Sequence, residues 1–306
     1  MHAPFSAEKP HTERWAYRRL YSANMFELAT RIYPIFRRPS AQALGRTIAW
    51  VYAVTQHPIR RIVRENLSLL RKEPVSEQEA ISVFVNFGGT IADYVAVGAL
   101  SSEKAMAFCA EHVGVEHLQA ATSGEQGVIL ATAHFSFFEF GAVVLGQMGR
   151  KVTIATLPEP SDELTAWRAA WRRRWSTETI AVGTDPFSSL QVARAIEEGH
   201  CMAMLADRPI AERGVSFELP NGRTMLSSSP ALLSWMTGCK ILPVIVSRRS
   251  DGRYRIIAKP AVEAQRVPHR QRDEEIARCT RELGSSLFEE IRRAPQQWYQ
   301  FVPVGL

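Results

Sequence analysis

The sequence predicts an α/β fold: a central, largely parallel (mixed) sheet flanked by helices, with an N-terminal helical region. From residue 128 onward, short apolar runs of strand length alternate with stretches of helical periodicity, which is typical of a sheet covered by helices on both faces. Residues 12–100 show helical patterns interrupted by prolines. The composition, 46% hydrophobic and 22% charged over 306 residues, is that of a globular protein with a full core. We therefore expect two regions, 1–100 and 101–306.

The N-terminal region is expected to be helical after a disordered leader, residues 1–11. Residues 15–38 mix aromatic side chains with arginines. This mixture suits an amphipathic helix in the headgroup layer of an anionic membrane, and it equally suits a helix that packs its apolar face on the protein. Ser76 and Glu79 have the spacing of a capping box that opens a long helix. The interrupting prolines are Pro34, Pro39, Pro58 and Pro74.

The second region begins with helical pieces, residues 101–127, before strands and helices alternate. Expected strands are 128–132, 151–156, 178–182, 201–206 and 215–219, followed by a hairpin of 241–247 and 253–258 around Asp251-Gly252. Expected helices are 137–149, 161–175, 186–198, 227–236 and about 270–293. Pro230 near a helix start and Gly238 after its end follow the usual preferences of helix termini.

Charge and cysteine content narrow the class of protein. The net charge of +6 favours an anionic partner, either a membrane or a nucleic acid. Four cysteines, at positions 109, 201, 239 and 279, form no CxxC pair, so we predict no disulfide framework and no metal site, as suits a reducing compartment. The N-terminus lacks the apolar run of a secretory signal. Since no run of ~18 uninterrupted apolar residues occurs, we expect a soluble or surface-bound protein.

The stretch 128–145 carries the first candidate site. Its strongly polar side chains are His134 and Glu139, at the end of the predicted strand, where sites of open α/β sheets usually lie. Positions five apart on a regular helix point about 140° away from each other, so the two can meet only if His134 lies in the turn ahead of the helix. The alternative is a capping histidine and a solvated glutamate.

Two further clusters could bind an anion. Asp207 and Arg208 follow the strand 201–206, where Arg208 could bind a phosphate or an oxyanion and Asp207 could orient it; alternatively, the pair only closes a loop. Arg168 and Arg172 lie one turn apart on a helix that also carries tryptophans at 167, 171 and 175. A basic, tryptophan-rich helix suits anionic headgroups, and no nucleic-acid motif accompanies it. The serines 227–229 either hold an anion or cap a helix.

Taken together, these motifs resemble the lysophospholipid acyltransferase superfamily, and within it the branch of lipid A late acyltransferases and phosphatidylinositol mannoside acyltransferases. The resemblance rests on the order and spacing of several landmarks over most of the chain. They are Arg64-Glu65-Asn66-Leu67, His134-x4-Glu139, Asp207-Arg208, the segment 214–222, the segment 237–244 and Pro295-x-Gln-Trp298.

The resemblance implies an O-acyltransferase that moves a fatty acyl chain from acyl carrier protein or acyl-CoA to a hydroxyl of a membrane lipid or glycolipid. Region 1–100 would associate with the membrane, and region 101–306 would be the acyltransferase domain. His134 would be the general base and Glu139 its acidic partner, while Asp207, Arg208, Arg168 and Arg172 would bind substrate. No cofactor is expected besides the acyl donor. The implied location is peripheral, on the cytoplasmic face of the inner membrane.

Direct attack by the acceptor hydroxyl is the expected mechanism, since the stretch around His134 offers no Gly-x-Ser-x-Gly nucleophile. Glu139 is expected to hold the imidazole tautomer and stabilise the imidazolium. Two alternatives remain: a thioesterase or hydrolase that uses the same pair on water, and a non-enzymatic protein that binds anionic membranes.

Overall fold

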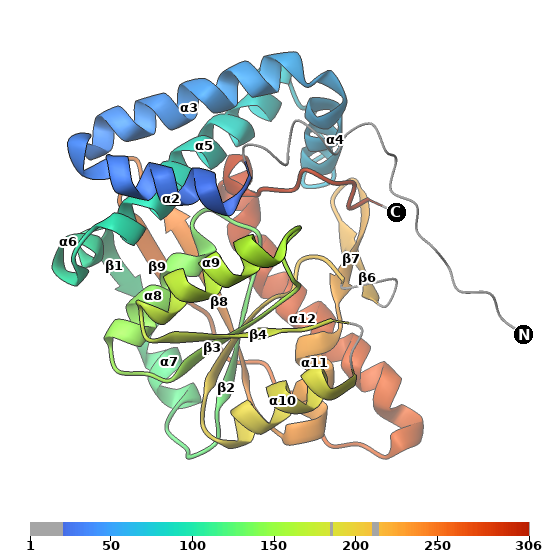
Figure 1. Ribbon diagram of the computed structural model, residues 1–306. Coiled ribbons are helices and arrows are strands. Elements are labelled where there is room, and N and C mark those ends of the chain that lie inside the picture. The colour runs from blue at the N-terminus through green and yellow to red at the C-terminus, as the bar shows by residue number, and fades with distance from the viewer. Residues whose placement is uncertain (1–20, 184–185, 210–213, 306) are drawn as a thin grey trace, which may run out of the picture.

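A seven-stranded mixed sheet forms the centre of the molecule and confirms the predicted fold class (Figure 1). The computed structural model describes residues 21–183, 186–209 and 214–305, so the predicted leader, 1–11, lies outside the described residues. In spatial order the strands are β1 (Cys109–Val113), β9 (Tyr254–Ala258), β8 (Ile241–Arg248), β2 (Val128–Thr132), β5 (Cys201–Leu205), β3 (Val152–Thr156) and β4 (Thr177–Ala181).

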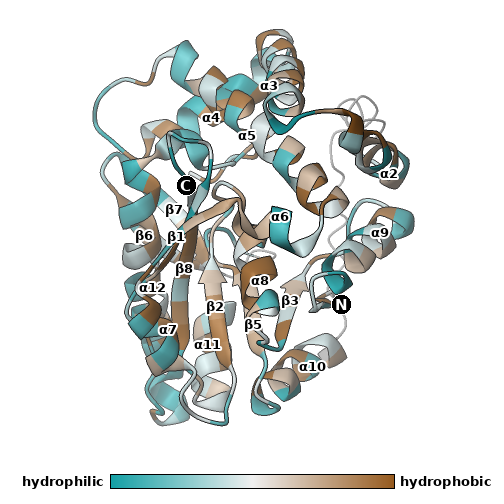
Figure 2. Cartoon of the chain, turned by 90° about the vertical axis from the view of Figure 1, so that its left-hand side faces the viewer, coloured by the Kyte–Doolittle hydropathy of each residue, from teal (hydrophilic) through white to brown (hydrophobic). Residues whose placement is uncertain are grey.

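The five strands from β8 to β4 are mutually parallel, whereas β9 runs antiparallel to β8 and carries β1 on its other side. The predicted hairpin is therefore confirmed as β8–β9. A second hairpin, β6 (Gly214–Leu219) and β7 (Gly222–Ser227), stands apart from the main sheet. The sequence predicted neither β1 nor β7. Central strands are almost wholly apolar (Figure 2), because both faces of the sheet are covered.

Helices cover both faces, and alternate residues of each strand enter different cores. Ile129 of β2 belongs to the core that also contains α10, α11 and α12, whereas Leu130 belongs to the core beneath α8 and α9. The helices of this part are α6 (Ser102–Met106), α7 (Val115–Ala121), α8 (Phe138–Gln147), α9 (Asp162–Arg173), α10 (Pro186–Glu197), α11 (Ser229–Thr237) and α12 (Arg272–Arg293), with short 3₁₀ turns η2 (His269–Gln271) and η3 (Pro295–Gln297).

The N-terminal helices lie across one end of the sheet, at the top of Figure 1. They are α2 (Ala23–Ile32), the 3₁₀ turn η1 (Tyr33–Ile35), α3 (Arg38–Thr55), α4 (His57–Ser68) and α5 (Glu77–Ala99). Their side chains share cores with the sheet, as Val83 does with Ile129. The capping box is confirmed, because the Glu79 amide donates to Ser76 Oγ and the Ser76 amide to Glu79 Oε2.

Close packing joins α3 to α5. A Cβ added at Gly88 would lie 2.3 Å from the Gly45 carbonyl oxygen, and one added at Gly45 would lie 2.5 Å from the Gly88 oxygen, so each backbone occupies the space of the other's side chain. By length and composition α5 could cross a membrane, but 61% of that apolar stretch is buried inside the protein. Here α5 acts as a core helix that holds the N-terminal layer against the sheet.

Candidate active site

His134 lies in a turn between β2 and α8, ahead of the helix, as predicted. The helix begins only at Phe138, and Ser136 adopts a positive φ of 50°. This left-handed conformation is uncommon for serine, and the Ser136 amide is held by a 2.7 Å hydrogen bond to the Gln297 carbonyl. The turn leaves the imidazole of His134 at the carboxyl end of β2, with its side chain 20% exposed.

Asp207 is the partner of His134. The strands β2 and β5 are parallel neighbours, and their last residues, Thr132 and Leu205, lie opposite each other. His134 and Asp207 each come two residues after the end of their strand, so they lie at the same level of the sheet. His134 Nδ1 lies 2.8 Å from Asp207 Oδ1, and the His134 amide donates to Asp207 Oδ2 at 3.0 Å. One carboxylate thus fixes both the ring and the backbone of the histidine.

Asp207 is fully buried and held as an anion. Besides His134, Trp298 Nε1 and Gln300 Nε2 donate to its Oδ2 at 2.9 and 2.7 Å. Burial alone would raise the pKa of this carboxyl. The charge of His134 and the hydrogen bonds from His134 and Trp298 outweigh burial and lower the pKa to about 2. A stable carboxylate at this position orients the ring that it contacts.

Arg208 lies at the other ring nitrogen of His134. Its Nη2 lies 3.2 Å from His134 Nε2. Since a guanidinium can only donate, Nε2 accepts, and in the neutral ring the proton is on Nδ1, facing Asp207. Nε2 is therefore the basic nitrogen, next to a permanent positive charge.

Glu139 does not contact His134, so the predicted pairing of these two residues is wrong. Glu139 lies in the first turn of α8 and points to α9, where its Oε1 accepts from Arg168 Nη2 at 2.7 Å and from Arg172 Nε at 3.1 Å. Burial would raise the pKa of Glu139, but the two arginines lower it to about 2. Asp207 and Arg208 lie at the two ring nitrogens of His134, while the arginines of α9 hold the Glu139 carboxylate.

The cluster around α9 is electrically balanced. Arg168 also pairs with Glu159 at 2.5 Å, so two arginines share two glutamates. Arg172 is 3% exposed. Both arginines, predicted to bind substrate, are joined to Glu139 rather than to His134 or Asp207. They hold the first turn of α8 against α9.

The tryptophans of the α9 segment do not form an outward-facing line. Trp171 is buried and stacks on Tyr94 with ring centroids 4.2 Å apart, and Trp175 is buried too. Trp167 stacks on Phe26 of α2 at 5.0 Å. The interpretation of this helix as a membrane-facing element is therefore wrong, because its aromatic face forms the contact with the N-terminal helices. At the start of α11, Ser227 Oγ accepts from the Ser229 amide at 3.3 Å, which is a capping type of contact.

Trp298 and Gln300 are site residues for which we predicted no role from the sequence, although Trp298 is one of the landmarks of the family resemblance. The tail that carries them runs beside the histidine turn: Phe135 bridges to Trp298, and the Tyr299 amide donates to the His134 carbonyl at 2.7 Å. Two adjacent aromatic residues flanked by glutamines, Gln297-Trp298-Tyr299-Gln300, are the signal that could have drawn attention to this segment.

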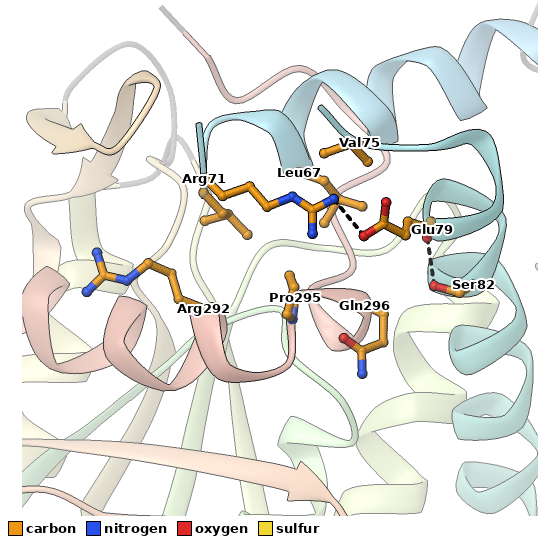
Figure 3. Close-up of a pocket in the computed structure, with 9 residues that line it drawn as sticks. Leu67, Arg71, Val75, Glu79, Ser82, Arg292, Pro295 and Gln296 are labelled. Atoms are coloured by element: carbon orange, nitrogen blue, oxygen red, sulfur yellow. Dashed lines mark hydrogen bonds and ion pairs between the residues drawn. The ribbon is translucent and has the colours of Figure 1, made fainter. Parts of the chain in front are cut away.

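A cavity of about 500 Å³ lies elsewhere, between α4, α5 and the end of α12 (Figure 3). Leu67, Leu70 and Val75 form its apolar side, and Arg71 reaches across it to Glu79 with a 2.6 Å ion pair. None of the residues that line it belongs to the histidine site. We therefore place the candidate active site at His134, where the charges converge, and not in this cavity.

An imidazole held by a buried aspartate, with its Nε2 next to an arginine at the carboxyl end of a parallel sheet, defines a site suited to acid–base chemistry on an anionic or carbonyl substrate. Comparison with known sequences agrees with this class. The sequence model described as "Bacterial lipid A biosynthesis acyltransferase" matches residues 3–303. The chain belongs to this family.

Individual relatives are distant. The chain is similar to the lipid A biosynthesis lauroyltransferase of Escherichia coli (strain K12), 24% identical over 212 residues, which cover 65% of each chain. It is also similar to the lipid A biosynthesis palmitoleoyltransferase of the same organism and to a lipid A biosynthesis acyltransferase of Shigella flexneri, each 23% identical over 190 residues, 60% of this chain and 58% of the relative. The chain thus spans less than two thirds of these relatives.

Proposed function

We propose that this protein is an O-acyltransferase that moves a fatty acyl chain from a thioester, carried by acyl carrier protein or coenzyme A, to a hydroxyl of a membrane lipid or glycolipid. Family membership supports acyl transfer to a lipid. The single structural observation that carries the proposal is the His134–Asp207 pair, because Nδ1 faces Asp207 and Nε2 is left as the basic nitrogen of a partly exposed side chain.

In this mechanism His134 Nε2 takes the proton of the acceptor hydroxyl as the oxygen attacks the thioester carbonyl. The new C–O bond forms, the C–S bond breaks, and the proton passes from the imidazolium to the departing thiolate. Asp207 keeps the Nδ1 tautomer and stabilises the imidazolium. The guanidinium of Arg208, beside Nε2, stabilises the oxyanion that develops on the carbonyl oxygen.

Arg168, Arg172 and Glu139 have a supporting role in this proposal. Their ion pairs anchor the start of α8 and hence the turn that carries His134. They are positioning residues, and Arg208 is the arginine that contacts substrate.

We further propose that the protein lies peripherally on the cytoplasmic face of the inner membrane and binds it through α2, η1 and α3. Large apolar side chains are exposed along these elements, among them Leu28 at 52%, Ile35 at 82% and Ile48 at 53%. Arg31 and Arg37 lie between them in the sequence, and the combination suits an anionic lipid surface.

Release of free thiol from an acyl thioester tests the reaction class. With the full chain, a medium-chain acyl-CoA and vesicles, release that requires a hydroxyl-bearing glycolipid, and that yields acylated lipid by mass spectrometry, supports the transferase. Equal release without any acceptor would instead support a thioesterase. No release in either case, with vesicle binding retained, would support a non-enzymatic membrane-binding protein.

A further inference from the structure

Arg46 and Arg248 differ from the arginines of the α9 cluster, because neither has an acidic partner. Arg46 lies on α3 and Arg248 ends β8. Within residues 21–183, 186–209 and 214–305, no carboxylate lies within ion-pair distance of either side chain. Both are half-buried, and the Nε atoms of both are buried without a hydrogen-bond partner. Partial burial removes some of the solvation of these two cations, and no carboxylate among the described residues pairs with either of them.

The two guanidinium groups converge on one point of α5. A Cβ added at Gly89 would lie 3.0 Å from Arg46 Nε and 3.1 Å from Arg248 Nη1. A methyl group at this position would force both arginines to give way by a few tenths of an ångström, so the missing side chain lets them approach the helix this closely. Burial, followed by the charge of Arg248, lowers the pKa of Arg46, as expected for neighbouring like charges.

Asp93, an acid whose charge acts on Arg46, is already neutralised. Arg38 donates to both of its oxygens at 2.9 Å, and Tyr254 donates at 2.6 Å. Gln42 adds a further donor to Asp93, and its own Oε1 accepts from Arg248 at 2.7 Å. Arg38 and Asp93 thus form a neutral pair, which leaves the charges of Arg46 and Arg248 uncompensated.

Arg248 is connected to the histidine turn through Gln297. The Arg248 amide donates to Gln297 Oε1 at 2.8 Å, and Gln297 Nε2 returns a 2.9 Å bond to the Arg248 carbonyl. The Gln297 carbonyl in turn accepts from the Ser136 amide at 2.7 Å. Arg248 is therefore held at the same end of the sheet as His134.

We propose that Arg46 and Arg248 form a binding site for the phosphate group of a substrate. Guanidinium groups match phosphate oxygens in geometry and charge, and a phosphate dianion would compensate both charges at once. The phosphate comes from one of two sources, the pantetheine arm of the acyl donor or the headgroup of the lipid acceptor. Its assignment to a substrate rests on the acyltransferase function proposed above.

Binding without turnover tests the site, so the result is independent of whether the protein transfers acyl groups. Inorganic pyrophosphate is titrated calorimetrically into the full chain and into the variants Arg46→Gln, Arg248→Gln and Gly89→Ala. We expect each variant to bind at least ten-fold more weakly, with thermal unfolding showing that each is folded. Gly89→Ala keeps both charges and only separates the guanidinium groups. The matched control is Arg61→Gln, since Arg61 is 70% exposed and pairs only with Glu65 at 3.7 Å; it should bind as the original chain does.

Competition identifies the source of the phosphate. If 4′-phosphopantetheine displaces pyrophosphate and pantetheine does not, the site binds the donor. If phosphatidylcholine vesicles displace pyrophosphate only when they contain phosphatidic acid, the site binds a lipid headgroup. Unchanged affinity in a folded Arg46→Gln/Arg248→Gln double variant, or displacement by neither competitor, would overturn the proposal.

Discussion

Asp207 is 73 residues beyond His134 in the sequence, yet its Oδ1 lies 2.8 Å from His134 Nδ1. The parallel register of β2 and β5 brings the two together, because each follows the same level of the sheet. Asp207, and not the predicted Glu139, is therefore the acidic partner of His134, and the two acids have different roles. Asp207 holds the imidazole of His134, which we propose as the base, and Glu139 anchors the helix that follows it.

Two carboxylates with low pKa values should make folding sensitive to acid. In the unfolded chain Asp and Glu titrate near ~3.9 and ~4.3, whereas Asp207 and Glu139 have pKa values of about 2 in the folded protein. Their stabilisation is therefore present above the unfolded values and is lost as the pH falls toward 2. Urea unfolding between pH 7 and 3 should show this loss. Glu139→Gln should lower the stability at pH 7 by about 3–5 kcal/mol because it leaves the buried Arg172 without a carboxylate and Arg168 with Glu159 alone, and its pH dependence should be shallower. The exposed Glu218→Gln serves as control, and equal slopes in all three proteins would contradict the assignment.

Trp298→Phe removes one hydrogen-bond donor to Asp207 and preserves most of the aromatic volume. We expect a loss of about 1–3 kcal/mol in unfolding free energy. The turnover number should be reduced but not abolished, because the Asp207 carboxylate keeps its contacts with His134 and Gln300. Denaturant unfolding and initial rates measure the two effects. A variant as stable and active as the original would show that this bond has no role.

Gly88→Ala tests the packing of α3 on α5. The added methyl would meet the Gly45 carbonyl at 2.3 Å, so the helices must separate, which we expect to cost about 1–3 kcal/mol. Gly124→Ala is the matched control, since a Cβ there meets nothing within 4 Å. Thermal unfolding should show a lower midpoint for Gly88→Ala only. Equal midpoints for the two variants would contradict the close packing of α3 on α5.

Ile35→Asp tests the proposed membrane surface. Ile35 is 82% exposed, so the substitution should leave the fold intact and weaken sedimentation with anionic vesicles by about ten-fold, through lost apolar burial and added repulsion. Leu190→Asp on α10, where the side chain is 49% exposed, should bind vesicles normally. Equal binding of both variants would exclude η1 from the contact.

The sequence predicted the fold better than it predicted the pairing of side chains. Apolar runs such as 128–132 and the capping box at Ser76 are local signals, and both are confirmed. The strand β1 escaped prediction because it is an edge strand with a half-exposed, polar sequence. The partner of His134 could not be read locally, since it depends on β5 lying beside β2. The role of Trp298 could not be predicted locally either, since it depends on the C-terminal segment lying beside the histidine turn.

The central claim is that His134 and Asp207 act as one catalytic unit. A double-mutant cycle of His134→Gln and Asp207→Asn on acceptor-dependent acyl transfer tests it most directly, with folding of each variant verified by circular dichroism. Each single variant should lower the turnover number by roughly 10²–10⁴-fold, and the double variant should be little worse than His134→Gln alone, because coupled residues are not additive. Losses that multiply in the double variant, or full activity of His134→Gln, would contradict the account.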